Sequence, residues 1–179
     1  MKEYIALLRG INVGGHKKVP MAILRELLAK SGFHNVQTYI QSGNVVFQTV
    51  ATDKKVLEEH ILYEIKDNFG FEVPVLVRTR QELKFIFDNC PFSKETKVNS
   101  YFIMLSEIPN KALMNEASKK IYPDDAYVIL NDCIYLFCAK GYGRAKFNLS
   151  FFEKKLKVNA TARNYKTMVK LLSLSQTNK

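Results

Sequence analysis

The feature that most constrains the fold is an order of strand-like and helix-like patterns that occurs twice along the 179 residues. The first occurrence predicts a strand at 2–8, a helix from Pro20 to Gly32, paired strands at 36–40 and 45–47, a helix from Asp53 to Gly70 and a strand at 73–77. A short helix at 81–89 follows. The second occurrence predicts a strand at 100–105, a helix at 109–121, paired strands at 126–130 and 134–137 and a helix at 149–156.

This repeated order predicts an α+β fold of two tandem ferredoxin-like halves of the βαββαβ type. We expect the halves to span residues 1–92 and 93–179. Residues 164–174 have helical spacing where a fourth strand of the second half would fall, so we expect that half to end in a helix. Strand runs such as 4–8 are apolar on both faces, which predicts that both faces are covered. An RNA-recognition module with exposed aromatic strands is therefore disfavoured.

The net charge of +10 is concentrated in the second half of the sequence. Residues 1–90 carry 12 basic and 10 acidic side chains, whereas residues 91–179 carry 15 and 7. From Lys140 to Lys179 there are ten Lys or Arg residues against the single acid Glu153. Such clustering attracts polyanions, including nucleic acid, although a solvated helical face that keeps the protein in solution would give the same pattern.

Composition also limits the classes of partner and cofactor. No apolar run approaches the roughly 18 residues of a membrane span, so we expect a cytoplasmic protein without a membrane partner. Cys90, Cys133 and Cys138 lack CxxC spacing, and we expect reduced thiols, with the last two on opposite faces of a sheet. The three histidines are widely spaced, so we expect neither a metal site nor a cofactor.

The segment RGINVGGHKK at 9–18 is the strongest candidate site. It comes close to the phosphate-loop pattern GxxxxGK[ST], but His16 precedes the lysine and no Ser or Thr follows, which argues against a nucleoside triphosphatase. Glycine amides can still form a concave anion site, and the N-terminus of the helix after Pro20 favours negative charge. A flexible basic loop is the alternative. The candidate anion-binding residues are Arg9, Gly10, Asn12, Gly14, Gly15 and Lys17.

The turn Gln41-Ser42-Gly43-Asn44 is a secondary candidate. In a βαββαβ layout we expect it at the opposite end of the first strand from the glycine segment. Ser42 lacks a nucleophile elbow and shows no triad pattern, so the alternative is an ordinary hairpin turn with local hydrogen bonds.

The third candidate is the segment 160–167. We expect Thr161 or Asn164 to cap the last helix and Arg163 to lie in its first turn, where a cation opposes the helix dipole. That placement favours an anionic partner, and the alternative is Arg163 paired with a carboxylate. Arg163 and Asn164 therefore join the candidate anion-binding residues, with Thr161 as a secondary candidate.

Three strings, YIALLRGINVGGHKKVPM, TYIQSGNVVF and TARNYKT, occur in this order over nearly the whole chain. With them the sequence resembles the bacterial family catalogued as domain of unknown function sixteen-ninety-seven. The resemblance implies two ferredoxin-like halves and no established activity, so it assigns no catalytic residue.

Our leading hypothesis is a protein whose glycine segment and Arg163 region form one anion pocket for a phosphate-bearing small molecule or a nucleic-acid backbone. A small acylphosphatase-like hydrolase is the first alternative, with Arg9 stabilising charge and Asn12 or Asn44 positioning water. The second alternative is a scaffold or dimerisation module, such as a homodimer, without a ligand.

Overall fold

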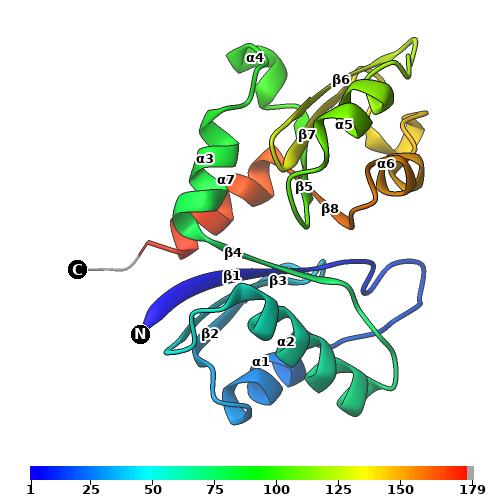
Figure 1. The fold of residues 1–179 in the computed structure, drawn as a ribbon. Helices are drawn as coiled ribbons and strands as arrows, with labels where there is room; N and C mark the ends of the chain where they lie inside the picture. Colours follow the sequence, from blue (N-terminus) through cyan, green and yellow to red (C-terminus); the bar gives the residue numbers. More distant parts are fainter. Residues whose placement is uncertain (177–179) are drawn as a thin grey trace. The chain divides into compact units, whose positions relative to one another are not determined.

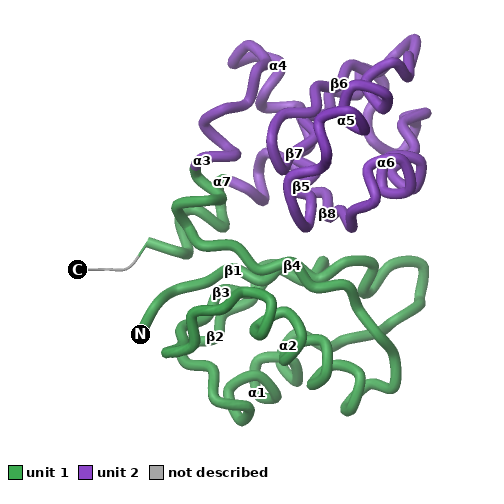
Figure 2. The backbone as a smooth tube through the Cα atoms, in the orientation of Figure 1, with its two compact units in different colours: residues 1–84, 169–179 green, residues 85–168 purple. Residues whose placement is uncertain are grey.

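The computed structural model describes residues 1–176, so Lys179, the last of the ten basic residues above, lies outside the described part. The chain is a mixed α+β protein with two four-stranded antiparallel sheets and, in the described residues, seven α-helices (Figure 1). By its contacts it divides into two compact units (Figure 2). Unit 1 contains residues 1–84 and the C-terminal residues from Val169, and unit 2 contains residues 85–168.

Unit 1 contains the first sheet and its helices. Its elements are β1 (Lys2–Leu8), α1 (Met21–Lys30), β2 (His34–Tyr39), β3 (Asn44–Thr49), α2 (Lys54–Phe69) and β4 (Val75–Thr79), followed by α3 (Arg80–Asp88), which continues into unit 2. The strand order is β2-β3-β1-β4, and every neighbouring pair is antiparallel. The register pairs Leu7 with Asn44 and Leu8 with Val75, so the end of β1 lies beside the starts of β3 and β4.

Local sequence signals set the helix ends in unit 1. The Asp53 carboxylate accepts hydrogen bonds from the backbone N–H groups of Lys55 and Val56 and caps α2. Gly70 ends the same helix with a φ of 77°, a left-handed conformation that glycine adopts without a side-chain clash. Both ends agree with the sequence prediction.

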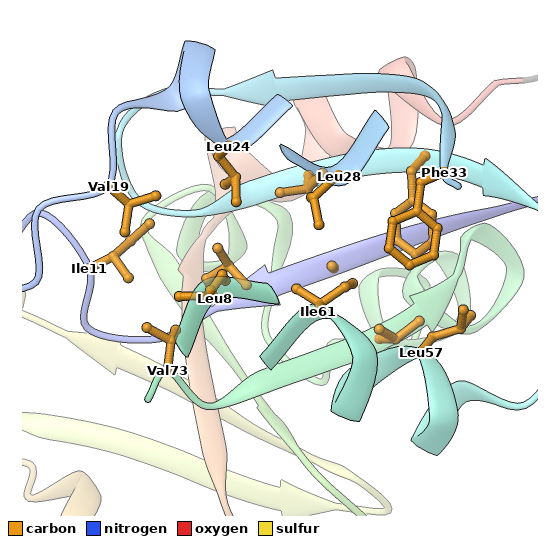
Figure 3. Close-up of a cluster of buried hydrophobic side chains, with 14 of the residues drawn as sticks. Leu8, Ile11, Val19, Leu24, Leu28, Phe33, Leu57, Ile61 and Val73 are labelled. Carbon is orange, nitrogen blue, oxygen red and sulfur yellow. The ribbon is translucent and has the colours of Figure 1, made fainter. Parts of the chain in front are cut away.

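The core of unit 1 lies between the sheet and the helices α1 and α2, which cover one of its faces (Figures 1 and 3). Tyr4, Ala6 and Leu8 of β1 belong to this core. Ile5 and Leu7 point to the other face and have no exposed surface. The expectation that both faces of the strands are covered is therefore confirmed.

Unit 2 repeats the same strand order. Its elements are α4 (Lys94–Lys97), β5 (Ser100–Leu105), α5 (Lys111–Ala117), β6 (Asp125–Leu130), β7 (Cys133–Cys138), the 3₁₀ turn η1 (Tyr142–Arg144), α6 (Leu149–Leu156) and β8 (Ala160–Asn164). The strands are ordered β6-β7-β5-β8, again with antiparallel neighbours. Helix α7 (Tyr165–Leu174) begins in unit 2 and ends in unit 1.

The expectation that the second half lacks its fourth strand is wrong. Residues 160–164 form β8 beside β5, and the helical pattern begins only at Tyr165. Ala160 faces the core under α5 and α6, whereas Thr161 and Arg163 on the opposite face are also buried. This strand is five residues long and carries small and polar side chains, so it lacks the β-branched and aromatic enrichment that marks a strand in a sequence.

The helix expected at 109–121 is shorter than predicted. It spans Lys111–Ala117, and the side chain of Asn110 caps it by accepting a hydrogen bond from Ala112 N–H. At its other end, the hydroxyl oxygen of Tyr127 lies 2.9 Å from the carbonyl oxygen of Ala117 and 2.6 Å from that of Lys120. The single hydroxyl proton of Tyr127 thus bonds a carbonyl at or just beyond the helix terminus, a tertiary contact that local spacing does not reveal.

Two further expectations from the sequence concern the cysteine thiols and membrane-spanning helices. All three cysteines are free thiols, and Cys138 belongs to the core under α5 and α6 while the buried Cys133 does not, as expected for opposite faces of β7. Within residues 1–176, every helix is too short or too polar to cross a membrane.

Candidate functional site

The glycine segment is a loop between β1 and α1 whose two ends are anchored in the core of unit 1. Ile11 and Val19 are 1% and 0% exposed, and their side chains point toward the same apolar cluster (Figure 3). Between them, residues 13–18 are all exposed. The sequence therefore builds a solvent-facing loop between two buried apolar residues.

Asn12 closes the base of this loop with its side chain. Its Oδ1 accepts a hydrogen bond from Val19 N–H at 2.8 Å, and its Nδ2 donates to the carbonyl oxygens of Val19 at 3.0 Å and Gln41 at 2.8 Å. The backbone adds a bond from Asn12 N–H to the carbonyl of Lys17 at 3.1 Å. The φ of Asn12 is 55°, a left-handed conformation that asparagine tolerates better than most residues. Asn12 is therefore a structural clamp.

The turn 41–44 lies against the glycine segment, so the expectation that it occupies the opposite end of β1 is wrong. Leu8 N–H donates to the carbonyl of Gly43 at 2.8 Å, in addition to the contact of Asn12 with Gln41. The reason is the antiparallel register, because the strand that leaves this turn starts where its partner β1 ends. Two sequence candidates thus form one structural region.

Gly43 is the point of closest approach between these two segments. Its φ is 77°, and a Cβ atom there would lie 2.5 Å from Leu8 Cβ and 3.0 Å from Ile11 Cδ1. Asn44 is fully buried, and its Nδ2 donates to the carbonyl of Tyr39 at 3.0 Å and to Ser42 Oγ at 2.9 Å. The turn is therefore a support for the loop.

The tip of the loop is a turn between Val13 and His16, whose N–H donates to the carbonyl of Val13 at 3.0 Å. Gly14 and Gly15 form its exposed corner with φ values of 58° and 79°. No protein acceptor within residues 1–176 takes a hydrogen bond from the amides of these two glycines. His16 and the two lysines that follow are exposed beside them.

Lys17 of the loop lies beside Glu72, an acidic residue whose charge is paired with another lysine. Lys17 Nζ donates to the backbone carbonyl of Glu72 at 2.7 Å, while the Glu72 carboxylate accepts from Lys66 Nζ at 2.6 Å. That hydrogen bond from Lys66 holds the pKa of Glu72 below its ordinary value. Because the Glu72 carboxylate is already paired with Lys66, it does not offset the positive charge of residues 16–18.

The third candidate region lies in unit 2, and the prediction that Arg163 occupies the first turn of the last helix is wrong. Arg163 lies in β8 opposite Phe102, is 8% exposed, and donates from Nη1 to the carbonyl of Ala162 at 2.9 Å. Burial lowers the pKa of its guanidinium to about 10. Thr161 also lies within β8 and is no helix cap.

Asn164 does cap the last helix, as one of the two predicted options. Its Oδ1 accepts a hydrogen bond from Thr167 N–H at 2.9 Å, so the side chain satisfies a donor in the first turn of α7. The glycine segment and the residues Arg163 and Asn164 thus belong to different compact units.

Sequence reasoning missed the residues that hold the loop in place. Ile11 and Val19 are ordinary apolar residues in the sequence. Lys66 and Glu72 are six residues apart, one inside α2 and one beyond its end, so helical spacing does not predict that they pair. An asparagine between glycines was the one available signal, because such a residue often adopts a left-handed conformation. Within the described residues, no group of three His, Cys, Asp or Glu side chains could hold a metal ion.

The fold and this loop define a mixed α+β protein of two similar halves with an exposed basic glycine loop. Residues 1–135 match the family model described as protein of unknown function (DUF1697), and the chain belongs to this family. Among solved structures, it is similar to a conserved bacterial protein from Streptococcus pneumoniae, with a TM-score of 0.77 and 23% identity over 97% of this chain and 98% of that chain. At this identity the similarity concerns the fold alone. No curated protein matches the sequence.

Proposed function

We propose that the protein binds the phosphates of an extended polyanion, such as a nucleic-acid backbone, through the exposed side of the glycine segment. One observation carries the proposal. Residues 13–18 are exposed over their whole length, contain three potentially cationic side chains and no acid, and are held at a fixed base by Asn12. A projecting basic loop fits a string of phosphates better than a single enclosed metabolite.

The proposed site consists of Arg9, Gly10, Asn12, Gly14, Gly15 and Lys17, with His16 and Lys18 added. Asn12 shapes the loop, the glycines bring backbone amides to the surface, and the cations supply attraction. We leave Arg163 and Asn164 outside it, because Arg163 is buried in unit 2 and Asn164 caps α7. The turn 41–44 supports the loop from behind.

The hydrolase alternative finds no support in these contacts. It requires an asparagine side chain that positions water, yet the side-chain amides of Asn12 and Asn44 both donate to oxygen atoms of the protein.

We also propose the ferredoxin-like class for the two halves at 1–92 and 93–179, on the basis of their matching strand orders.

The test measures binding of a fluorescently labelled DNA duplex by anisotropy at several salt concentrations. The double variant Lys17→Ala/Lys18→Ala removes two exposed cations, and we expect the slope of log affinity against log salt to become shallower by about 2. The matched control, Lys30→Ala/Lys55→Ala, removes two exposed helical lysines from the same unit and gives the same net charge. We expect its slope to equal that of the wild type within the uncertainty of the fit.

Two outcomes would overturn the proposal. One is the absence of duplex binding at low salt. The other is an equal change in slope for both double variants, which would mean that net charge alone attracts the duplex. If inorganic pyrophosphate at stoichiometric concentration displaced the duplex, the ligand of this site would be a small phosphate compound and not a polyanion.

A further inference from the structure

Unit 2 contains a cavity whose lining includes part of the third candidate segment, 160–167. Its volume is about 440 Å³, and it opens at the end of the second sheet where β5 begins and β7 and β8 end. Volumes of roughly 300 to 1,000 Å³ are typical of sites for small molecules. All of its lining residues belong to unit 2, so the cavity is independent of the glycine segment in unit 1.

Three of the residues that line this cavity are aromatic, and the strand register places Tyr101 and Phe137 on opposite faces of the sheet. Tyr101, Phe137 and Tyr165 line it. The ring of Tyr101 is stacked on that of Tyr142, with centroids 4.4 Å apart and planes inclined by 29°, and the ring of Tyr165 packs on Phe87 at 5.3 Å. Rings held in this way lose little freedom when a flat ligand stacks on them.

Two side-chain amides in the wall have fixed orientations. Asn164 Oδ1 accepts from Thr167 N–H, which leaves its Nδ2 as a donor, and within residues 1–176 that nitrogen has no acceptor. Asn99 Nδ2 donates to the carbonyl of Glu95 at 3.2 Å, which leaves its Oδ1 as an acceptor. These two amides contribute a donor and an acceptor to the wall, the two kinds of group that bind the edge of a nucleobase.

The charge of the cavity favours an anion. Lys166 lines it and is exposed, and its lining contains no Asp or Glu. Of the basic residues between 140 and 170, all but Arg163 are exposed, so the surrounding segment adds positive potential.

We propose that this cavity binds a nucleotide, with the base stacked on one of the aromatic residues that line it and the phosphate near Lys166. The nucleotide comes either as a free mononucleotide or as one residue of a single-stranded nucleic acid, and both present the same base and phosphate. The polyanion site on the glycine segment is separate, because none of its residues lines the cavity.

The first test is calorimetric titration with adenosine monophosphate, adenosine and inorganic phosphate. We expect the monophosphate to bind more tightly than either part alone. Lys166→Ala should weaken monophosphate binding about tenfold, as expected for a hydrogen bond to a charged group, and leave adenosine binding unchanged. Lys154→Ala removes an exposed helical lysine of the same unit that does not line the cavity, and should leave both affinities unchanged.

A second variant tests the cavity itself. Ala139 lines the cavity and is exposed, so Ala139→Trp should fill the space and abolish monophosphate binding without disturbing the core. Tighter binding of a single-stranded trinucleotide than of the monophosphate would identify nucleic acid as the source, and equal binding would identify the free nucleotide.

Three results would overturn the proposal: no heat of binding at millimolar monophosphate, equal weakening by Lys166→Ala and Lys154→Ala, or full binding by folded Ala139→Trp. The double variant Lys17→Ala/Lys18→Ala should leave monophosphate binding unchanged. This result separates failure of the cavity from failure of the glycine segment.

Discussion

Replacing Gly43 by alanine should destabilise unit 1 more than the same change at any glycine of the exposed loop tip. The new Cβ atom would lie 2.5 Å from Leu8 Cβ, and Leu8 cannot move away because its position is set by β1 and its N–H is bonded to the carbonyl of Gly43. The left-handed φ of 77° adds about 1 to 2 kcal/mol for a residue with a side chain. Overpacking of a filled site adds about 1 to 3 kcal/mol.

Gly15→Ala is the matched control for this prediction. Gly15 has nearly the same φ, 79°, and a Cβ atom there would meet nothing within 4 Å. Both substitutions therefore carry the backbone strain, and only Gly43→Ala carries the clash. We expect the free energy of unfolding to differ between them by about 1 to 3 kcal/mol.

The assay is urea unfolding followed by far-ultraviolet circular dichroism, because the chain contains no tryptophan. With an m-value of about 2 kcal/mol/M, the extra loss lowers the midpoint by about 0.5 to 1.5 M relative to Gly15→Ala. Equal midpoints for the two variants would refute the close packing of the turn 41–44 on the end of β1, and with it the support that this turn gives to the loop.

Two further predictions concern the loop clamp and the thiols. Asn12→Ala removes three side-chain hydrogen bonds and should lower the free energy of unfolding, measured in urea, by about 2 to 4 kcal/mol. Asn12→Gly relieves the positive φ and should recover about 1 kcal/mol of this loss. A loss smaller than that of an ordinary surface substitution would contradict the role of Asn12 as a clamp. Burial raises the pKa of all three cysteine thiols, that of Cys138 to about 11. Because the unfolded chain releases these protons at lower pH than the folded chain, the free energy of unfolding should decline as the pH rises above about 8.5. The native thiols should also react with Ellman's reagent at pH 8 more slowly than those of the urea-unfolded chain. Equal rates would contradict the burial of the thiols.

The elements with strong local signals were predictable from the sequence. Asp53 and Gly70 mark the two ends of α2, and the pair Asn131-Asp132 joins β6 to β7 with a φ of 53° at Asn131. These signals work because capping and turn formation depend on side chains within a few residues of each other. The strand β8 was missed because its short run ATARN gives no such signal.

For the candidate site, the sequence located the glycine segment but could not place its surroundings. The neighbourhood of Gly43 and Leu8 depends on the pairing of β1 with β3, which lie 35 or more residues apart in the sequence. The aromatic cavity depends in the same way on the ends of β5, β7 and β8 meeting at one edge of a sheet.

The amino-acid sequence by itself determined where most strands, helices and turns of this chain form, and that a basic glycine-rich loop follows the first strand. The tertiary structure alone decided that the turn 41–44 supports this loop, that Arg163 is buried in a strand, and that three aromatic residues line one cavity. The physical reason is that short-range propensities act within one turn or strand, whereas strand register brings together residues that are distant along the chain and sets which of them are buried.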